Sequence, residues 1–173
     1  MTLPPYSYGQ IMAHLQLFTD GSVNTQLKVG YGAYLLVSEL TMSTDTLKEQ
    51  VKIKRFEQTS STKLELQTLL WALAEIDALV NDEDTSLTVY TDSQNIIDLP
   101  SRQARLENSD FFTSSNKRLN NYQLYKTFYQ FTAGRTCTFV KVIGHQTSCK
   151  KDQVDKRFTL VDKASRQALR SEF

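Results

Sequence analysis

The sequence predicts an α/β domain built on a five-stranded mixed sheet flanked by helices. Three strand-like segments come first, separated by short polar loops, which is typical of an antiparallel meander. A helix then precedes each of the last two strand-like segments, and right-handed crossovers of this kind make strands four and five parallel to strand one. A chain of 173 residues fits one such domain and leaves little room for a second.

Runs of apolar and β-branched residues predict the three strands of the meander. Residues 15–20 form an apolar run that ends at Asp20 and Gly21, a pair that favours a turn. Residues 30–38 are rich in Tyr, Leu and Val, and residues 47–56 alternate well enough to be their partner strand.

Helical periodicity is clearest in residues 61–80. A Ser/Thr-rich start can cap this segment, and its apolar residues recur at helical spacing. After it, the sequence predicts a strand at 87–92, a short helix around 102–107, a helix at 121–132, a strand at 136–143 and a closing helix at 159–169.

Composition narrows the class of protein and its compartment. The net charge is +1, and the only two cysteines, Cys137 and Cys149, lack the spacing of a disulfide framework or a metal site. No basic residue precedes an apolar run at the N-terminus, and no run approaches about 18 apolar residues. We therefore expect a cytoplasmic protein without a membrane partner, with a lead-in over residues 1–13 and one domain over 14–173.

Charge is unevenly distributed along the chain. Between Asp98 and Arg157 there are eleven Lys or Arg and five Asp or Glu, so the remainder holds nine basic and fourteen acidic residues. A basic flank suits contact with a polyanion, and an acidic remainder suits a metal site. A solvated basic surface explains the same split equally well.

Two aspartates end strands that we expect to be parallel neighbours. Asp20 closes the first strand and Asp92 closes the fourth. Parallel strands bring their carboxyl ends to one edge of the sheet, where ligands bind in open α/β folds. Taken singly, Asp20 is explained by a turn and Asp92 by a helix cap, but their joint occurrence at one edge favours a shared crevice.

Two further acids lie near the starts of predicted helices, on the helical face that apolar residues occupy. Glu65 is followed at four, seven and eleven residues by Leu69, Ala72 and Ile76, so it continues their helical face. Asp162 likewise starts the last helix among apolar residues, although the helix dipole alone explains an acid at either place. Because a buried carboxylate without a partner is costly, we expect a cation between the acids, and Mg²⁺ suits oxygen ligands in the absence of a His or Cys cluster.

Five blocks of the sequence resemble type 1 ribonuclease H in their order and spacing. They are FTDGS (18–22), GYGAY (30–34), STKLELQTLLWAL (61–73), YTDSQNI (90–96) and KVIGHQ (141–146). The likeness covers about residues 14–170. It implies the ribonuclease H fold and an endoribonuclease that cuts the RNA strand of RNA–DNA hybrids with two Mg²⁺ ions, or with Mn²⁺ in their place.

The resemblance also implies roles for particular residues. Asp20, Glu65, Asp92 and Asp162 would bind the metal ions, and His145 would assist proton transfer or product release, as the near-neutral pKa of imidazole allows. An exposed loop histidine without a role is the alternative for His145. The residues expected to contact the hybrid are Gly21, Ser22, Ser61, Thr62, Gln94, Arg102, Arg105, Lys117 and Arg118, of which the four basic ones are explained equally well as solvated surface.

The sequence departs from the family pattern in three places. Asp162 comes seventeen positions after His145, a longer spacing than in the common bacterial enzymes, and Asp152 and Asp155 between them are rivals for the fourth carboxylate. We prefer Asp162 because it opens an amphipathic helix, whereas both rivals lie in a predicted polar loop. The asparagine pair that often precedes the helical glutamate is missing, and the segment expected to form a basic protrusion has no tryptophan.

Three functions are compatible with these residues. The first is cleavage of RNA–DNA hybrids by a monomeric enzyme. The second is a nuclease of the same fold aimed at another nucleic acid, such as double-stranded RNA or a DNA junction. The third is a non-catalytic hybrid-binding module, which the presence of all four acids disfavours.

Overall fold

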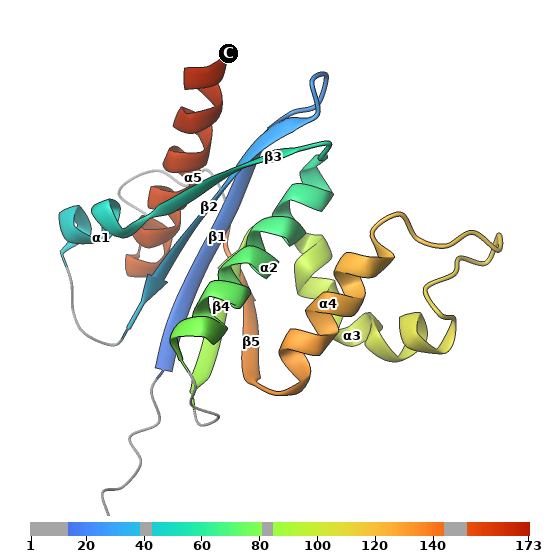
Figure 1. Ribbon diagram of the computed structural model, residues 1–173. Helices are drawn as coiled ribbons and strands as arrows, with labels where there is room; N and C mark the ends of the chain where they lie inside the picture. The colour runs from blue at the N-terminus through green and yellow to red at the C-terminus, as the bar shows by residue number, and fades with distance from the viewer. Residues whose placement is uncertain (1–13, 39–42, 81–84, 144–151) are drawn as a thin grey trace, which may run out of the picture.

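The computed structural model describes residues 14–38, 43–80, 85–143 and 152–173 of the chain (Figure 1). These residues form one five-stranded sheet of order β3-β2-β1-β4-β5. Its strands are β1 (His14–Asn24), β2 (Val29–Val37), β3 (Lys52–Glu57), β4 (Ser86–Thr91) and β5 (Thr136–Lys141). β1 and β3 are antiparallel to β2, whereas β4 is parallel to β1 and β5 is parallel to β4. The predicted fold class and strand directions are therefore confirmed.

Helices cover both faces of the sheet. They are α1 (Thr44–Gln50), α2 (Ser61–Leu79), α3 (Gln94–Asn108), α4 (Tyr122–Ala133) and α5 (Gln153–Glu172). Successive residues of a strand point to opposite faces, so Leu17 packs into the core with α2, α3 and α4, while Phe18 packs into the core with α1 and α5. In the ranges described, no helix combines the length and apolar character needed to cross a membrane.

The turn-forming pair Asp20-Gly21 predicts that the first strand ends at Asp20. Instead, β1 continues to Asn24. Gly21 still pairs with β2, and the chain reverses only at 25–28, where the Asn24 side chain accepts two backbone hydrogen bonds of 3.1 Å. Asp20 therefore lies inside a strand, with β2 beside it.

The predicted strand at 47–56 is wrong in its first half, because Thr44–Gln50 form α1. The hydroxyl of Ser43 accepts a hydrogen bond from the Thr46 N–H (3.2 Å) and caps this helix, and Leu47 is its one buried residue. Over so few residues, apolar spacing does not separate a short helix from a strand. Only Lys52–Glu57 joins the sheet.

Side-chain caps make α3 and α5 begin earlier than predicted. Ser93 accepts a backbone hydrogen bond (3.4 Å) and starts α3, which continues through Pro100 and contains the short helix predicted at 102–107. Asp152 and Asp155 form a capping box that starts α5 ahead of the predicted closing helix. The predicted polar loop that contains Asp152 and Asp155 is therefore partly helical.

Three glycines let α2 pack very close to β1 and β2. A Cβ on Gly21 would lie 2.9 Å from Leu64 of α2, and one on Gly30 would lie 2.6 Å from it. One on Gly32 would lie 2.1 Å from the hydroxyl of Thr68. Close-packed interiors do not tolerate such approaches, so the bare backbone sets the depth at which α2 rests on the sheet.

We predict that Gly32→Ala lowers the free energy of unfolding by about 1–3 kcal/mol, because the new methyl group overlaps Thr68, whose hydroxyl is already bonded to the Leu64 carbonyl (2.7 Å). α2 must then move away from the sheet, and Glu65 moves with it. Denaturant unfolding measures the loss. Gly134→Ala is the control, since nothing lies within 4 Å of its added Cβ, and equal losses in the two variants would contradict the close approach.

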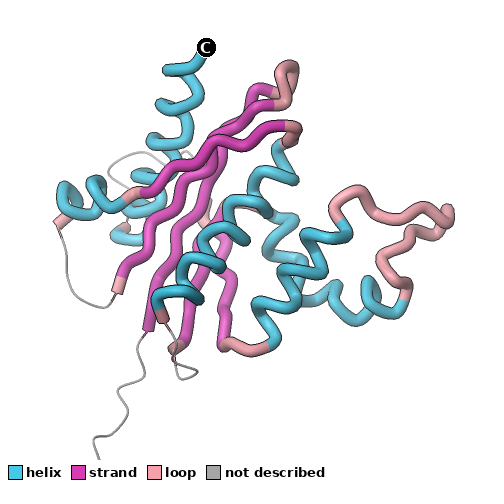
Figure 2. Tube along the Cα trace, in the orientation of Figure 1, coloured by secondary structure: helices cyan, strands magenta, loops and turns pink. Residues whose placement is uncertain are grey.

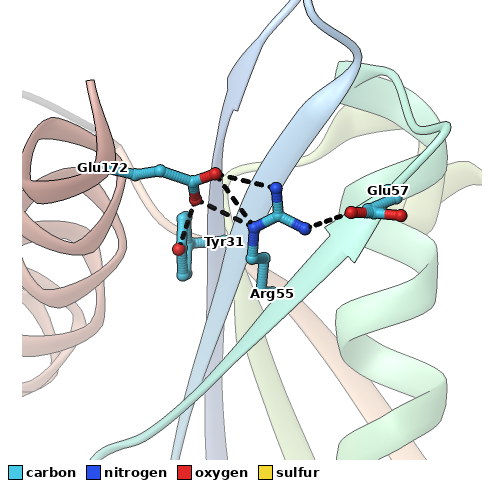
Figure 3. Close-up of polar contacts among 4 residues, drawn as sticks. All are labelled: Tyr31, Arg55, Glu57 and Glu172. Carbon is cyan, nitrogen blue, oxygen red and sulfur yellow. Dashed lines mark hydrogen bonds and ion pairs between the residues drawn. The ribbon is translucent and has the colours of Figure 1, made fainter.

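A polar network ties the C-terminal end of α5 to β2 and β3 (Figure 3). Glu172 accepts hydrogen bonds from Arg55 (2.7–3.1 Å) and from the Tyr31 hydroxyl (2.5 Å), and Arg55 also pairs with Glu57 (2.5 Å). The bonds from Arg55 and Tyr31 lower the pKa of Glu172 to about 2. An acid whose folded pKa is depressed stabilises the protein above its unfolded pKa, so this contribution is lost progressively as the pH falls from about 4.5 to about 2.

Candidate active site

The parallel pairing of β1 and β4 brings Asp20 and Asp92 level with each other. Phe18 lies opposite Tyr90 in the register, and each aspartate follows two residues later. β4 ends at Thr91, so Asp92 stands where the chain leaves the sheet and turns into α3. The two acids therefore meet at one edge of the sheet, as the sequence predicts.

Asp20 is the most enclosed of the four acids, with 9% of its surface exposed. Burial and then the charge of Asp92 raise the pKa of Asp20 to about 8, and Asp162 adds to the shift through its charge and a hydrogen bond. The Gly21 N–H opposes the shift by donating a hydrogen bond to Asp20. In the protein alone, the Asp20 carboxyl group therefore resists ionisation below about pH 8.

Glu65 reaches the same edge from α2. It is half-buried, and this burial raises the pKa of its carboxyl group. The charge of Asp92 also raises it, while a hydrogen bond with Ser93 lowers it. Glu65 therefore lies close to Asp92 and to the cap of α3, on the α2 side of the sheet.

α5 supplies the fourth acid from the opposite face of the sheet. The carboxyl group of Asp162 accepts a hydrogen bond from protonated Asp20, and Arg166, one helical turn later, pairs with Asp162 (2.8 Å). The fully buried Ser165 donates to the Asp162 carbonyl (3.1 Å), and its hydroxyl lies 3.0 Å from that of Ser22 in β1. These contacts hold this part of α5 against the strand that carries Asp20.

The two rival acids are engaged elsewhere. Asp152 and Asp155 accept each other's backbone N–H groups in the capping box of α5 (2.9 and 3.3 Å). Neither is among the causes of the raised pKa of Asp20, whereas Asp162 is. Of the three candidates for the fourth position, Asp162 is the one that meets Asp20.

The chemistry of these four side chains suits a hard divalent cation. All are carboxylates, and burial first and then the charges of neighbouring carboxylates raise the pKa values of Asp20 and Glu65; a bound cation would oppose both effects. Their geometry is less complete, since the described part of the chain holds no group of three or more Asp, Glu, His or Cys arranged to bind a metal ion. Asp162 is instead paired with Arg166 (2.8 Å).

Gln94, an expected substrate contact, lies exposed at the start of α3. Its amide N–H donates to Asp98 (2.8 Å), and its carbonyl accepts from Nζ of Lys141 (2.6 Å) at the end of β5.

Two basic residues near the acids were not predicted from the sequence. Lys141 is not among the expected contacts, and only its place at the start of the KVIGHQ block could have indicated it. Arg166 is also missing from them, although its spacing of four residues from Asp162 is a helical pair signal.

Two of the four basic residues expected to contact the hybrid lie on α3. Arg102 is half-buried, donates to the Asn95 side chain (3.2 Å) and lies 5.9 Å from the ring centre of Tyr125. Arg105 is exposed. Arg102 therefore belongs to the packing of α3 against α4, and Arg105 faces solvent.

The other two basic residues lie in the loop 109–121, which projects between α3 and α4 (Figure 2). The guanidinium of Arg118 lies 4.8 Å from the ring centre of Phe112 and 4.5 Å from that of Tyr122, and it pairs with an aspartate of the same loop (2.6 Å). Lys117 is exposed. Arg118 therefore organises the loop, while Lys117 stands on its surface.

The remaining expected residues flank the acids in sequence. Ser61 and Thr62 are the exposed first residues of α2, and Gly21 and Ser22 continue β1 beyond the first acid. His145 lies outside the described residues, so its role stays a prediction.

The sheet order, the crossovers and the acidic edge together define a protein of the ribonuclease H-like class. The RNase H family model matches residues 12–168, and the chain belongs to this family. No curated protein matches the chain.

Solved structures share this fold at low sequence identity. LC9-RNase H1, described as a type 1 RNase H with the type 2 active-site motif, is 14% identical, with a TM-score of 0.67 over 94% of this chain and 74% of that one. RNase H1 from the halophilic archaeon Halobacterium salinarum NRC-1 is 12% identical, with a TM-score of 0.59 over 91% and 98%. A foamy viral protease-reverse transcriptase in complex with RNA/DNA hybrid is 10% identical (TM-score 0.64); the match covers 90% of this chain, which spans only 20% of the viral protein.

We predict that Asp20→Asn stabilises the metal-free protein by about 1–3 kcal/mol near pH 8, because an amide removes a buried charge that repels Asp92 and Asp162. The pKa of Asp20 is higher in the folded state than its unfolded value of about 4, so the penalty of the native acid starts near pH 4 and grows until about pH 8.

Unfolding experiments in EDTA at about pH 3 and pH 8 test this prediction. The gain should vanish at the lower pH, where the acid is neutral in both states. Glu49→Gln, an exposed change on α1, is the control. A gain of the same size at both pH values would show that charge is not its cause.

Proposed function

We propose that this protein is an endoribonuclease that hydrolyses the RNA strand of RNA–DNA hybrids with two divalent metal ions. The observation that carries the proposal is the convergence of acids from four separate segments of the chain. Asp20 feels the charges of Asp92 and Asp162, and Glu65 feels that of Asp92. Packing alone gives no reason for this arrangement, since each added carboxylate increases the repulsion.

The four acids would hold the ions, with Mg²⁺ preferred and Mn²⁺ as the alternative. When bound, the ions would supply Lewis-acid chemistry for the attacking water and for the leaving oxygen of a phosphodiester. The chain itself fixes the carboxylates: Ser93 hydrogen-bonds to Glu65, and Ser165 holds the backbone of Asp162. His145 would carry a proton to or from the reacting groups.

A hybrid substrate is supported by the family and by structural relatives. Both the foamy viral enzyme and LC11-RNase H1, which is 15% identical with a TM-score of 0.54, are described in complex with RNA/DNA hybrid. In this chain, Ser22 and Gln94 beside the acids would contact RNA 2′-hydroxyls, and the exposed Arg105 and Lys117 would bind DNA phosphates.

We predict that the protein cleaves the RNA strand of a labelled hybrid in Mg²⁺ and that Asp92→Asn reduces the rate by about a hundredfold or more. Asp45→Asn, an exposed change on α1, is the matched control and should leave the rate unchanged. The same assay includes double-stranded RNA and double-stranded DNA. Preferred cleavage of another duplex would show that the hybrid is not the main substrate. Tight hybrid binding without cleavage in Mg²⁺ or Mn²⁺ would show that the protein is a binding module and not an enzyme.

Arg166 provides a second test because its guanidinium lies 2.8 Å from the Asp162 carboxylate, which is expected to bind a cation. We predict that Arg166→Gln strengthens Mn²⁺ binding by about two- to fivefold, since a partly exposed ion pair no longer competes for the carboxylate. Calorimetric titration without nucleic acid measures this affinity, and Arg166→Lys should restore the native value. Weaker Mn²⁺ binding in the glutamine variant would show that Arg166 supports the metal site instead of competing with it.

A further inference from the structure

A groove lies between α5, α1 and the edge strand β3. It has a volume of about 400 Å³, and its floor is aliphatic, formed by Val51, Ile53, Leu160, Ala164 and Ala168. Ile53 is 47% exposed, although it is a large apolar side chain. Exposed aliphatic surface gathered around a hollow is typical of a binding surface.

The charge at the rim of this groove is positive. Lys48 of α1 and Lys163 of α5 are both exposed, and the two other rim residues, Gln167 and Ser171, are uncharged. None of the residues that line the groove is acidic, and all of them belong to the described ranges. The groove therefore complements a ligand that carries negative charge next to apolar groups.

β3, which forms one wall, has an unpaired edge. Among the described residues it pairs with β2 alone, so the backbone groups on its other side are open to an added strand. Its side chains alternate between faces, and Ile53 points to the groove. Lys52 and Lys54 point to α2, where Lys52 pairs with Glu75 (2.9 Å) and Lys54 lies 5.7 Å from the ring centre of Trp71.

We propose that this surface binds an extended segment of a partner protein in which acidic and apolar residues alternate. The segment adds to the free edge of β3 as a sixth strand. Its apolar side chains enter the groove beside Ile53, and its acidic side chains face Lys52 and Lys54 on the other side of the sheet. Lys48 and Lys163 attract acidic residues that flank the inserted part.

Two other occupants match the surface less well. Single-stranded nucleic acid is usually bound on aromatic platforms, and none of the residues lining the groove is aromatic. A second copy paired through β3 would bring two strands together that each carry three basic residues and one acid. The charge that complements an acidic segment thus opposes self-pairing.

The probe is the fluorescein-labelled peptide acetyl-Asp-Leu-Asp-Leu-Asp-Leu-Asp-amide, titrated with the full chain and followed by anisotropy. Saturable binding is expected, with amide NMR shifts in β3 and in the α5 residues that line the groove. A peptide of the same composition with its leucines adjacent, and one with lysine in place of aspartate, should each bind at least about tenfold more weakly.

Three substitutions assign the binding to the groove. Ile53→Glu should weaken peptide binding by about tenfold or more, because it places a negative charge on the apolar floor. Lys163→Glu should weaken it by about threefold. Lys126→Glu is the control, an exposed lysine on α4, away from β3, and should have no effect (Figure 1). Thermal melts verify folding, and Ile53→Ala, with a smaller loss expected, replaces the glutamate variant if that variant does not fold.

The result that overturns the proposal is the absence of saturable binding below 1 mM peptide, or binding that both Ile53 variants leave unchanged. Displacement of the peptide by a short DNA duplex would make the surface a nucleic-acid site. A dimer in sedimentation that Ile53→Glu dissociates would make the occupant a second copy. None of these outcomes depends on hybrid cleavage, so the two proposals fail separately.

Discussion

The close approach of α2 to the sheet is the constraint on which the candidate site depends. Gly21, Gly30 and Gly32 leave no side chain between the strands and α2, and Leu64 and Thr68 occupy the space. Glu65 lies next to Leu64, so the depth of that contact fixes how far its carboxylate extends toward Asp92. A layer of ordinary side chains at these positions would hold the helix away from the sheet. The acidic site therefore depends on the three glycines as well as on the four acidic side chains.

Repulsion among the acids has to be offset elsewhere, and α5 shows how. The helix is held at its start by the capping box, in its middle by the buried Ser165 and at its end by the pairing of Glu172 with Arg55. Phe158 and Val161 also bury its inner face against the sheet. Asp162 cannot withdraw from Asp20 unless these contacts move with it. The fold thus keeps the carboxyl groups of Asp20 and Asp162 close together.

Much of this arrangement follows from the sequence because it rests on periodic burial and on the order of elements. The order of strands and crossovers alone predicts that Asp20 and Asp92 share an edge, and the helical stripe starting at Glu65 predicts its direction. Boundaries set by a single side chain do not follow in the same way. Asn24 moves the end of β1, and Ser43 converts half of a predicted strand into α1, because one or two hydrogen bonds decide between conformations of similar propensity.

The partners of the acids were the least predictable part of the site. The spacing of Asp162 and Arg166 in the closing helix predicts their ion pair, but it does not predict that α5 brings this pair to Asp20 of β1. Ser165 and Ser22 are in contact although they lie 143 positions apart in the sequence, so no local sequence pattern could predict this contact. Sequence periodicity therefore identifies which acids turn inward. Whether each acid then meets a cation, a hydroxyl group or another acid is decided by how α2 and α5 dock on the sheet, which only the assembled fold determines.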